Sequence, residues 1–161
     1  MIDALYSARL LQLAADLPRV GRLAAPDARA ERTAKLCGSR VAVEVNVADG
    51  AVTDFAQEVQ ACALGQASAA VLGEAVVGAR VEEIEAARDA LHAMLRAGGA
   101  PPEGRFATLA ALAPVRDYPA RHASVLLAFE AAAAAAREAA GGRSATPVLP
   151  PLFPAEAGTQ V

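Results

Sequence analysis

The chain has 161 residues, a length that suits one domain with its own hydrophobic core. Hydrophobic residues make up 55% of it and aromatic residues only 4%, so the core is expected to consist mainly of Val, Leu and Ala. The formal net charge of −3 gives no excess of positive charge for a nucleic-acid backbone, and no apolar run is long enough to span a bilayer. We therefore expect neither nucleic acid nor a membrane as a partner.

The first residues, Met-Ile-Asp-Ala-Leu-Tyr, lack the basic and apolar regions of a secretory signal, which predicts a cytoplasmic location. In that compartment the two cysteines, Cys37 and Cys62, are expected to be reduced rather than joined in a disulfide. Composition alone is equally compatible with two buried and chemically inert thiols.

The first half of the chain contains one helical pattern followed by alternating patterns. Leucines near helical spacing predict an amphipathic helix over 3–17, which Pro18 ends. Residues 19–26 are expected to be an extended, turn-rich lead-in, and 27–36 either a short helix or an irregular loop. From Arg40 to Val47 valines alternate with other residues, which predicts a strand with one buried face.

A hairpin is expected next. Asp49-Gly50 predicts a type I′ turn, because glycine adopts the positive φ that this turn requires. The run 52–60 is interpreted as the returning strand, and a third short strand could lie within 55–60 after a kink. Together these elements predict a small antiparallel sheet of about three strands.

The second half of the chain is predominantly helical. Apolar stripes predict helices over 63–77 and 81–96, with Gly78 as a C-terminal cap of the first. A short helix or ordered segment is expected over 106–112, then an extended stretch over 115–121 and a last helix over 122–140 that Gly141-Gly142 ends. We expect an α+β domain spanning 1–142, and a disordered proline-rich tail over 143–161.

Both cysteines are expected at boundaries between loops and regular elements. Cys37 lies on a loop before a strand, and Cys62 lies at the start of the 63–77 helix. Backbone N–H groups and the helix dipole at a helix start favour the thiolate, which is the form that attacks sulfur and binds metal. These two thiols are therefore candidate ligands and Cys62 is a candidate nucleophile.

Two thiolates do not complete a tetrahedral site, since zinc and iron–sulfur clusters usually take four ligands. The segment that opens the last helix could add the imidazole of His122 or the hydroxyl of Ser124. A solvent-facing His122 without any role is an equally simple interpretation. No phosphate loop, catalytic triad or dinucleotide motif can be assembled from the chain.

Several ordered motifs resemble the U-type iron–sulfur cluster assembly scaffold family, which includes the NifU N-terminal domain, IscU and SufU. They are Cys37-Gly-Ser39, the valine hairpin, Ala61-Cys-Ala-Leu-Gly-Gln-Ala-Ser68, Pro18-Arg-Val-Gly21 and Leu109-Ala-Ala-Leu-Ala-Pro-Val-Arg-Asp-Tyr-Pro-Ala-Arg121. The last motif and the insertion-like segment 80–112 are most similar to SufU-like members. The resemblance covers roughly residues 5–140 and implies the family's α+β fold.

The resemblance also identifies where this chain departs from the family pattern. Cys37 and Cys62 match the first two of three cysteines, while Ser39 replaces an aspartate. Ungapped alignment places Ser124 at the third cysteine; a shift of one residue would place Ala123 there and His122 at a neighbouring histidine. Under either alignment the third thiol is missing, and Arg121 occupies the place of a basic residue.

Three functions are compatible with this resemblance. The first is a scaffold or carrier that binds iron or a nascent cluster through Cys37 and Cys62, with Ser39, His122 or Ser124 as weaker ligands or with thiols from a second protomer. The second is a zinc-dependent sulfurtransferase in which Cys62 accepts a persulfide. The third is a paralogue that only binds assembly partners and holds no cofactor. The implied partners are a cysteine desulfurase and cluster recipients, and the protein could be a monomer or a homodimer.

Overall fold

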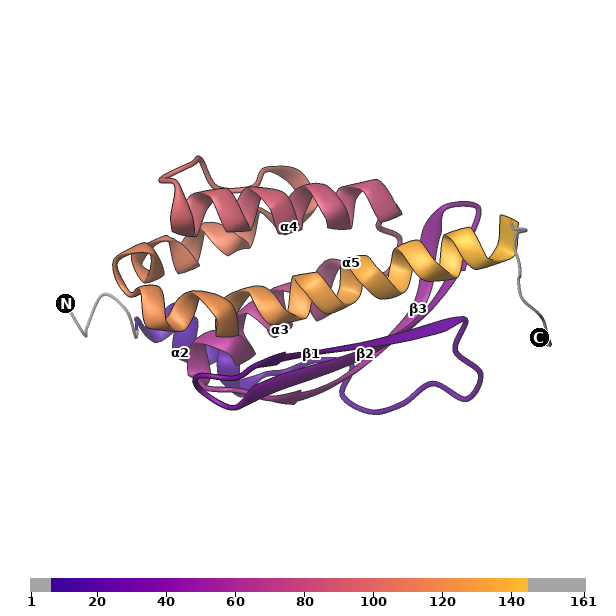
Figure 1. Ribbon diagram of the computed structural model, residues 1–161, viewed down its shortest axis with the longest axis horizontal. Helices are drawn as coiled ribbons and strands as arrows, with labels where there is room; N and C mark the ends of the chain where they lie inside the picture. Colours follow the sequence, from indigo (N-terminus) through magenta and orange to yellow (C-terminus); the bar gives the residue numbers. More distant parts are fainter. Residues whose placement is uncertain (1–6, 145–161) are drawn as a thin grey trace.

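A computed structural model describes residues 7–144 as an α+β fold, in which helices cover one face of a three-stranded antiparallel sheet (Figure 1). The long helix α5 lies across β1 and β2, and α4 packs on α5 on the side away from the sheet. The elements in chain order are α2 (Ala8–Ala15), β1 (Ala28–Ala34), β2 (Ser39–Ala48), β3 (Ala51–Gln60), α3 (Ala63–Ala75), α4 (Val81–Arg96), the 3-10 helices η1 (Gly104–Asp117) and η2 (Pro119–Arg121), and α5 (His122–Ser144).

The β2–β3 hairpin forms as the sequence predicts. Asp49 and Gly50 both have positive φ, 55° and 78°, as a type I′ turn requires. The alternating valines of β2 are buried as expected, since Val41, Val43 and Val45 are fully buried, but the expectation of a single buried face is wrong because Ala42 and Glu44 on the other face are buried too. β3 is continuous over Ala51–Gln60, so the expectation of a separate short strand within 55–60 is wrong.

The third strand is instead β1, in the segment expected to be a short helix or an irregular loop. It pairs with β2 from Ala28 opposite Val45 to Ala34 opposite Ser39. Its sequence, ARAERTA, carries charged residues because it is an edge strand, and charge on an edge discourages pairing with other chains. The face of β1 that continues the buried valine face of β2 carries Ala28, Ala30, Arg32 and Ala34, and only Ala28 and Ala34 are buried, which explains why no apolar alternation was visible.

The connection from α4 to α5 is helical, so the extended stretch expected over 115–121 is wrong. Its apolar residues Phe106, Leu109, Leu112 and Val115 recur every three positions, which is the period of a 3-10 helix, and all four are buried. The last helix also runs through Gly141-Gly142 to Ser144 instead of ending at 140. Residues 3–6 of the expected first helix and 145–161 of the expected tail lie outside the described residues.

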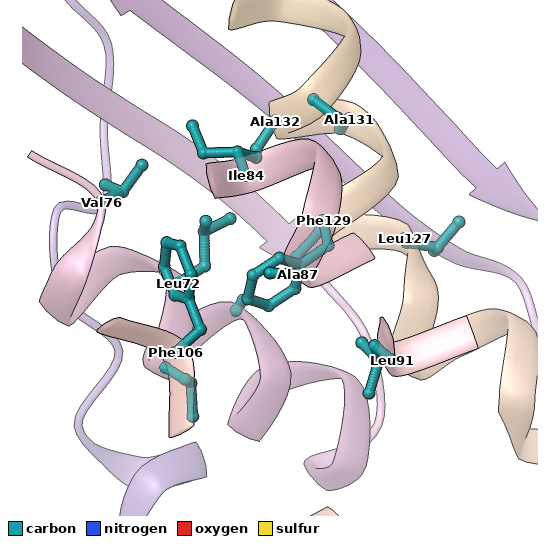
Figure 2. Close-up of a cluster of buried hydrophobic side chains, with 14 of the residues drawn as sticks. Leu72, Val76, Ile84, Ala87, Leu91, Phe106, Leu127, Phe129, Ala131 and Ala132 are labelled. Carbon is teal, nitrogen blue, oxygen red and sulfur yellow. The ribbon is translucent and has the colours of Figure 1, made fainter. Parts of the chain in front are cut away.

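A second apolar layer joins α3, α4, η1 and α5. Figure 2 shows Leu72, Ile84 and Leu91 packed around the rings of Phe106 and Phe129. These rings meet edge to face with centroids 5.3 Å apart. The long alanine run of α5 is almost wholly buried, and its small side chains let α5 lie close to its neighbours. In the part of the chain that is described, no helix is both long and apolar enough to cross a membrane.

The segment that precedes β1 is held against the sheet by the buried carboxylate of Glu44 in β2. Glu44 is only 2% exposed, and its oxygens accept hydrogen bonds from Arg22 Nε at 2.7 Å, Arg29 Nη1 at 3.0 Å and the Leu23 N–H at 2.8 Å. Burial would raise the pKa of this carboxyl, but the Leu23 N–H and the two guanidinium groups outweigh burial and lower it. The negative charge of Glu44 is therefore balanced by the guanidinium groups of Arg22 and Arg29 that contact it.

Candidate functional site

Four polar side chains from distant parts of the sequence meet at one end of the molecule. Cys37 lies in the turn between β1 and β2, Ser39 begins β2, Cys62 is the N-cap of α3, and Ser124 lies in the first turn of α5. Cys37 Sγ is 3.2 Å from Ser39 Oγ, Ser39 Oγ is 3.0 Å from Ser124 Oγ, and Ser124 Oγ is 3.6 Å from Cys62 Sγ. The two thiols are thus the ends of one hydrogen-bonded chain.

Close packing between α3 and α5 brings the two helix starts together. Gly65 lies against α5 so tightly that an added Cβ would be 2.7 Å from Ser124 Oγ and 2.8 Å from the Cβ of Ala61. One turn further on, Ser68 Oγ donates a 2.7 Å hydrogen bond to the main-chain oxygen of Val125. Sequence reasoning did not identify Gly65, and its only signal was a glycine in the first turn of a predicted helix.

The environment of the Cys62 thiol favours its thiolate form. Burial would raise its pKa, but hydrogen bonds from the backbone N–H groups of Gly65 and Leu64, from the hydroxyl of Ser124 and from the guanidinium of Arg121 outweigh burial. The net effect is a lowered pKa, so the thiolate fraction of Cys62 is raised. This matches the expectation from its place at a helix start.

Cys37 occupies a more open position in the β1–β2 turn. Hydrogen bonds from the side chain and then the backbone of Ser39 lower the pKa of the Cys37 thiol. The following residue, Gly38, has a φ of 73°, which lets the chain turn back into β2 directly after the thiol. Both thiols are free, with Cys37 exposed and Cys62 half-buried.

His122 does not join this hydrogen-bonded chain. Its side chain is 6% exposed, so the interpretation of a solvent-facing histidine is wrong. Its Nε2 lies 3.0 Å from the main-chain oxygen of Val115 and 3.1 Å from that of Arg116, and Nε2 therefore carries the proton in the neutral ring. The ring thus links the end of η1 to the first residue of α5 by hydrogen bonds.

The ligand set that the fold assembles is two thiols and two hydroxyls. Within residues 7–144, no group of three or more His, Cys, Asp or Glu side chains is placed to hold a metal ion. Neutral hydroxyls are weak ligands for zinc or iron compared with thiolates, imidazoles and carboxylates. One protomer therefore offers half of a four-ligand set for zinc or an iron–sulfur cluster, and does not by itself fit either.

This fold and this site define a class of protein: an α+β domain that holds a cysteine pair between a β-hairpin and two helix starts. Residues 5–125 match the model of the NifU-like N terminal domain, and the chain belongs to that family. The match spans most of the chain and includes Cys37, Cys62 and Ser124. The resemblance drawn from the motifs is thereby confirmed.

Individual relatives agree with the family assignment. The iron–sulfur cluster assembly scaffold protein IscU of Thermotoga maritima is 33% identical over 94 residues, which span 58% of this chain and 66% of that protein, just under two thirds of its length. The crystal structure of a nitrogen-fixing NifU-like protein (N-terminal) from Brucella abortus is 52% identical, with a TM-score of 0.85 over 86% of this chain and 96% of that one.

A more distant structure supports the fold alone. The SUF-system protein FiSufU from Fervidobacterium islandicum is 21% identical, with a TM-score of 0.76 over 83% of this chain and 98% of that one. The predicted α+β class with a small antiparallel sheet is confirmed by these structures and by the sheet itself.

Proposed function

We propose that this protein is an iron–sulfur cluster assembly scaffold that binds iron or a nascent cluster through Cys37 and Cys62. The observation that carries the proposal is the hydrogen-bonded chain Cys37–Ser39–Ser124–Cys62, which brings together two thiols from separate elements. The printed name of the Thermotoga maritima relative, a cluster assembly scaffold protein, supports the same function. The cluster is the cargo of such a protein and leaves for a recipient.

The residues of the chain suit the thiolate form that iron requires. Cys37 and Cys62 both have a lowered pKa, so each thiol gives up its proton to solvent more readily than a free cysteine. Ser39 and Ser124 each have one hydroxyl proton, which can be donated either to the neighbouring sulfur or to the other serine, and Arg121 adds a positive charge beside Cys62. These groups stabilise negative charge on sulfur without competing for the metal.

The test is the iron and acid-labile sulfide content of protein that is reduced, freed of small thiols and reconstituted without air. We expect both to be bound by the native chain and lost in Cys37→Ala and in Cys62→Ala. Thr53→Ala is a matched control, because Thr53 is exposed on β3 near the turn at the other end of the hairpin. Native protein that takes up neither iron nor sulfide would contradict the proposal.

Sulfur transfer is a second candidate function, favoured by the environment of Cys62. The Cys62 thiolate would attack the terminal sulfur of a desulfurase persulfide, so that the persulfide S–S bond breaks and the desulfurase cysteine leaves as a thiolate. The transferred sulfur would then be held in a new S–S bond on Cys62.

A desulfurase assay separates the two candidates. Sulfur transfer predicts that the desulfurase turns over faster when this protein is added, that Cys62 gains one sulfur atom in its peptide mass, and that Cys62→Ala abolishes both effects. Binding of the desulfurase that survives replacement of both cysteines by serine, with no iron, sulfide or zinc bound, would instead support a protein that only binds assembly partners. The partners expected are a cysteine desulfurase and cluster recipients.

A further inference from the structure

A surface pocket of about 500 Å³ lies between the end of α4 and the junction of η2 with α5. The end of α4 and the start of α5 are at the same end of the molecule (Figure 1). The residues that line the pocket are Leu95, Arg96, Gly98, Arg116, Pro119 and His122. None of them belongs to the hydrogen-bonded chain of thiols and hydroxyls, and the volume is within the range of pockets that bind small organic molecules.

The charged side chains of this pocket are both positive. Arg96 is the last residue of α4 and Arg116 lies near the end of η1, and both are exposed. Within residues 7–144 neither guanidinium forms an ion pair or a side-chain hydrogen bond, and no Asp or Glu of that range lines the pocket. Both groups therefore keep their N–H donors for an anion, and the planar guanidinium matches the oxygens of a carboxylate or a phosphate.

The ring of His122 adds a buried polar group to the pocket. It is 6% exposed, and its Nε2–H donates to the main-chain oxygens of Val115 and Arg116, which fixes its orientation. Its Nδ1 has no partner among the described residues, yet the only buried side-chain N or O atom left unpartnered there is Gln57 Oε1, so Nδ1 is accessible to solvent. In the neutral ring this nitrogen is an acceptor, and it therefore suits a ligand that also carries a hydroxyl donor.

The number of charges indicates the class of anion. A phosphate monoester carries about −1.5 to −2 at pH 7, which two guanidinium groups balance, whereas a carboxylate needs only one. Leu95 and Pro119 add apolar surface for the carbon skeleton of a ligand. We propose that this pocket binds a small hydroxylated phosphate monoester of the sugar phosphate class, with its phosphate on Arg96 and Arg116 and one hydroxyl donating to His122 Nδ1. This second site is independent of the proposed scaffold function.

The test is titration of the full chain with ribose 5-phosphate, followed by calorimetry and by the ³¹P resonance of the probe. We expect saturable binding of one molecule per chain, no binding of ribose, and affinity for methyl phosphate that is lower by about tenfold or more, because methyl phosphate has no hydroxyl for His122. Absence of ribose 5-phosphate binding would overturn the proposal. Binding to vesicles that contain phosphatidic acid, without binding of the soluble ester, would assign the phosphate to a lipid headgroup and would also overturn it.

Single-charge variants locate the binding. Arg96→Gln and Arg116→Gln should each lower the affinity for ribose 5-phosphate by about tenfold or more, because each removes a charge-assisted hydrogen bond to the phosphate. Arg9→Gln is the matched control, since Arg9 is an exposed arginine of α2 that does not line the pocket. An equal loss in Arg9→Gln would show attraction by overall charge and would overturn the site. Iron and sulfide content after reconstitution should be the same in Arg96→Gln as in the native chain, which separates this test from that of the scaffold function.

Discussion

Ser39 Oγ lies 3.0 Å from Ser124 Oγ, although the two residues are 85 positions apart in the chain. This hydrogen bond links the start of β2 to the first turn of α5, and each hydroxyl also lies beside one thiol. The pair therefore sets the spacing of Cys37 and Cys62. In the ungapped alignment with the family, the pair also occupies the two positions of a carboxylate and a third thiolate.

Restoring those two ligands should create a site within one protomer. Ser39→Asp with Ser124→Cys adds a carboxylate and a thiolate to the existing thiols, and we expect zinc affinity to rise by about a hundredfold or more, as for a site that gains two strong ligands. Competition with a chromophoric chelator measures this. Ser68→Cys is the control, since it adds a third thiol outside the site. An unchanged zinc affinity would show that these positions do not form a ligand set.

The hydroxyl of Ser124 should control the acidity of Cys62. Ser124→Ala removes a hydrogen bond that lowers the pKa of this thiol, so the pKa should rise and alkylation of Cys62 by iodoacetamide should slow at neutral pH. Residue-specific labelling followed by mass spectrometry over a pH series separates Cys62 from Cys37. Ser68→Ala, which removes a hydroxyl bonded to the Val125 oxygen, should leave the Cys62 pKa unchanged. Equal shifts in the two variants would argue against the role of Ser124.

Gly65 should be essential for the approach of α3 to α5. In Gly65→Ala the new methyl group would lie 2.7 Å from Ser124 Oγ and 2.8 Å from the Ala61 Cβ, so the helices must separate. We expect a loss of about 1–3 kcal/mol in the free energy of unfolding, measured with urea. Gly141→Ala on α5 has open space and should instead gain about 0.5–1 kcal/mol. A Gly65→Ala variant as stable as the native chain would contradict the close packing.

Glu44 should make stability depend on acid pH. Its folded-state pKa is lowered, so the stabilisation is present above the unfolded pKa of about 4.3 and is lost as pH falls through the lower folded pKa. Glu44→Gln should cost about 2 kcal/mol at pH 7, because two charge-assisted hydrogen bonds are weakened, and should flatten the pH dependence below pH 4.5. Glu138→Gln, at an exposed position on α5, is the control. If the free energy of unfolding depended on pH in the same way in the native chain and in Glu44→Gln, Glu44 would not be the source of the acid sensitivity.

The sequence by itself determined the elements whose residues repeat with a local period. The alternating valines and Asp49-Gly50 specify the β2–β3 hairpin, because alternation and positive φ are properties of neighbouring residues. The helices α3 and α4 follow from their apolar stripes. The place of Cys62 at a helix start was visible for the same reason, and with it the direction of the shift in its pKa.

Only the tertiary structure decided what depends on contacts between distant segments. β1 is held by backbone hydrogen bonds to β2, which are independent of side-chain type, so its charged sequence concealed it. The orientation of His122 is set by the main-chain oxygens of the preceding 3-10 helix. The meeting of Ser39 with Ser124 requires the approach of α3 and α5 that Gly65 permits, and this packing has no local signature in the sequence.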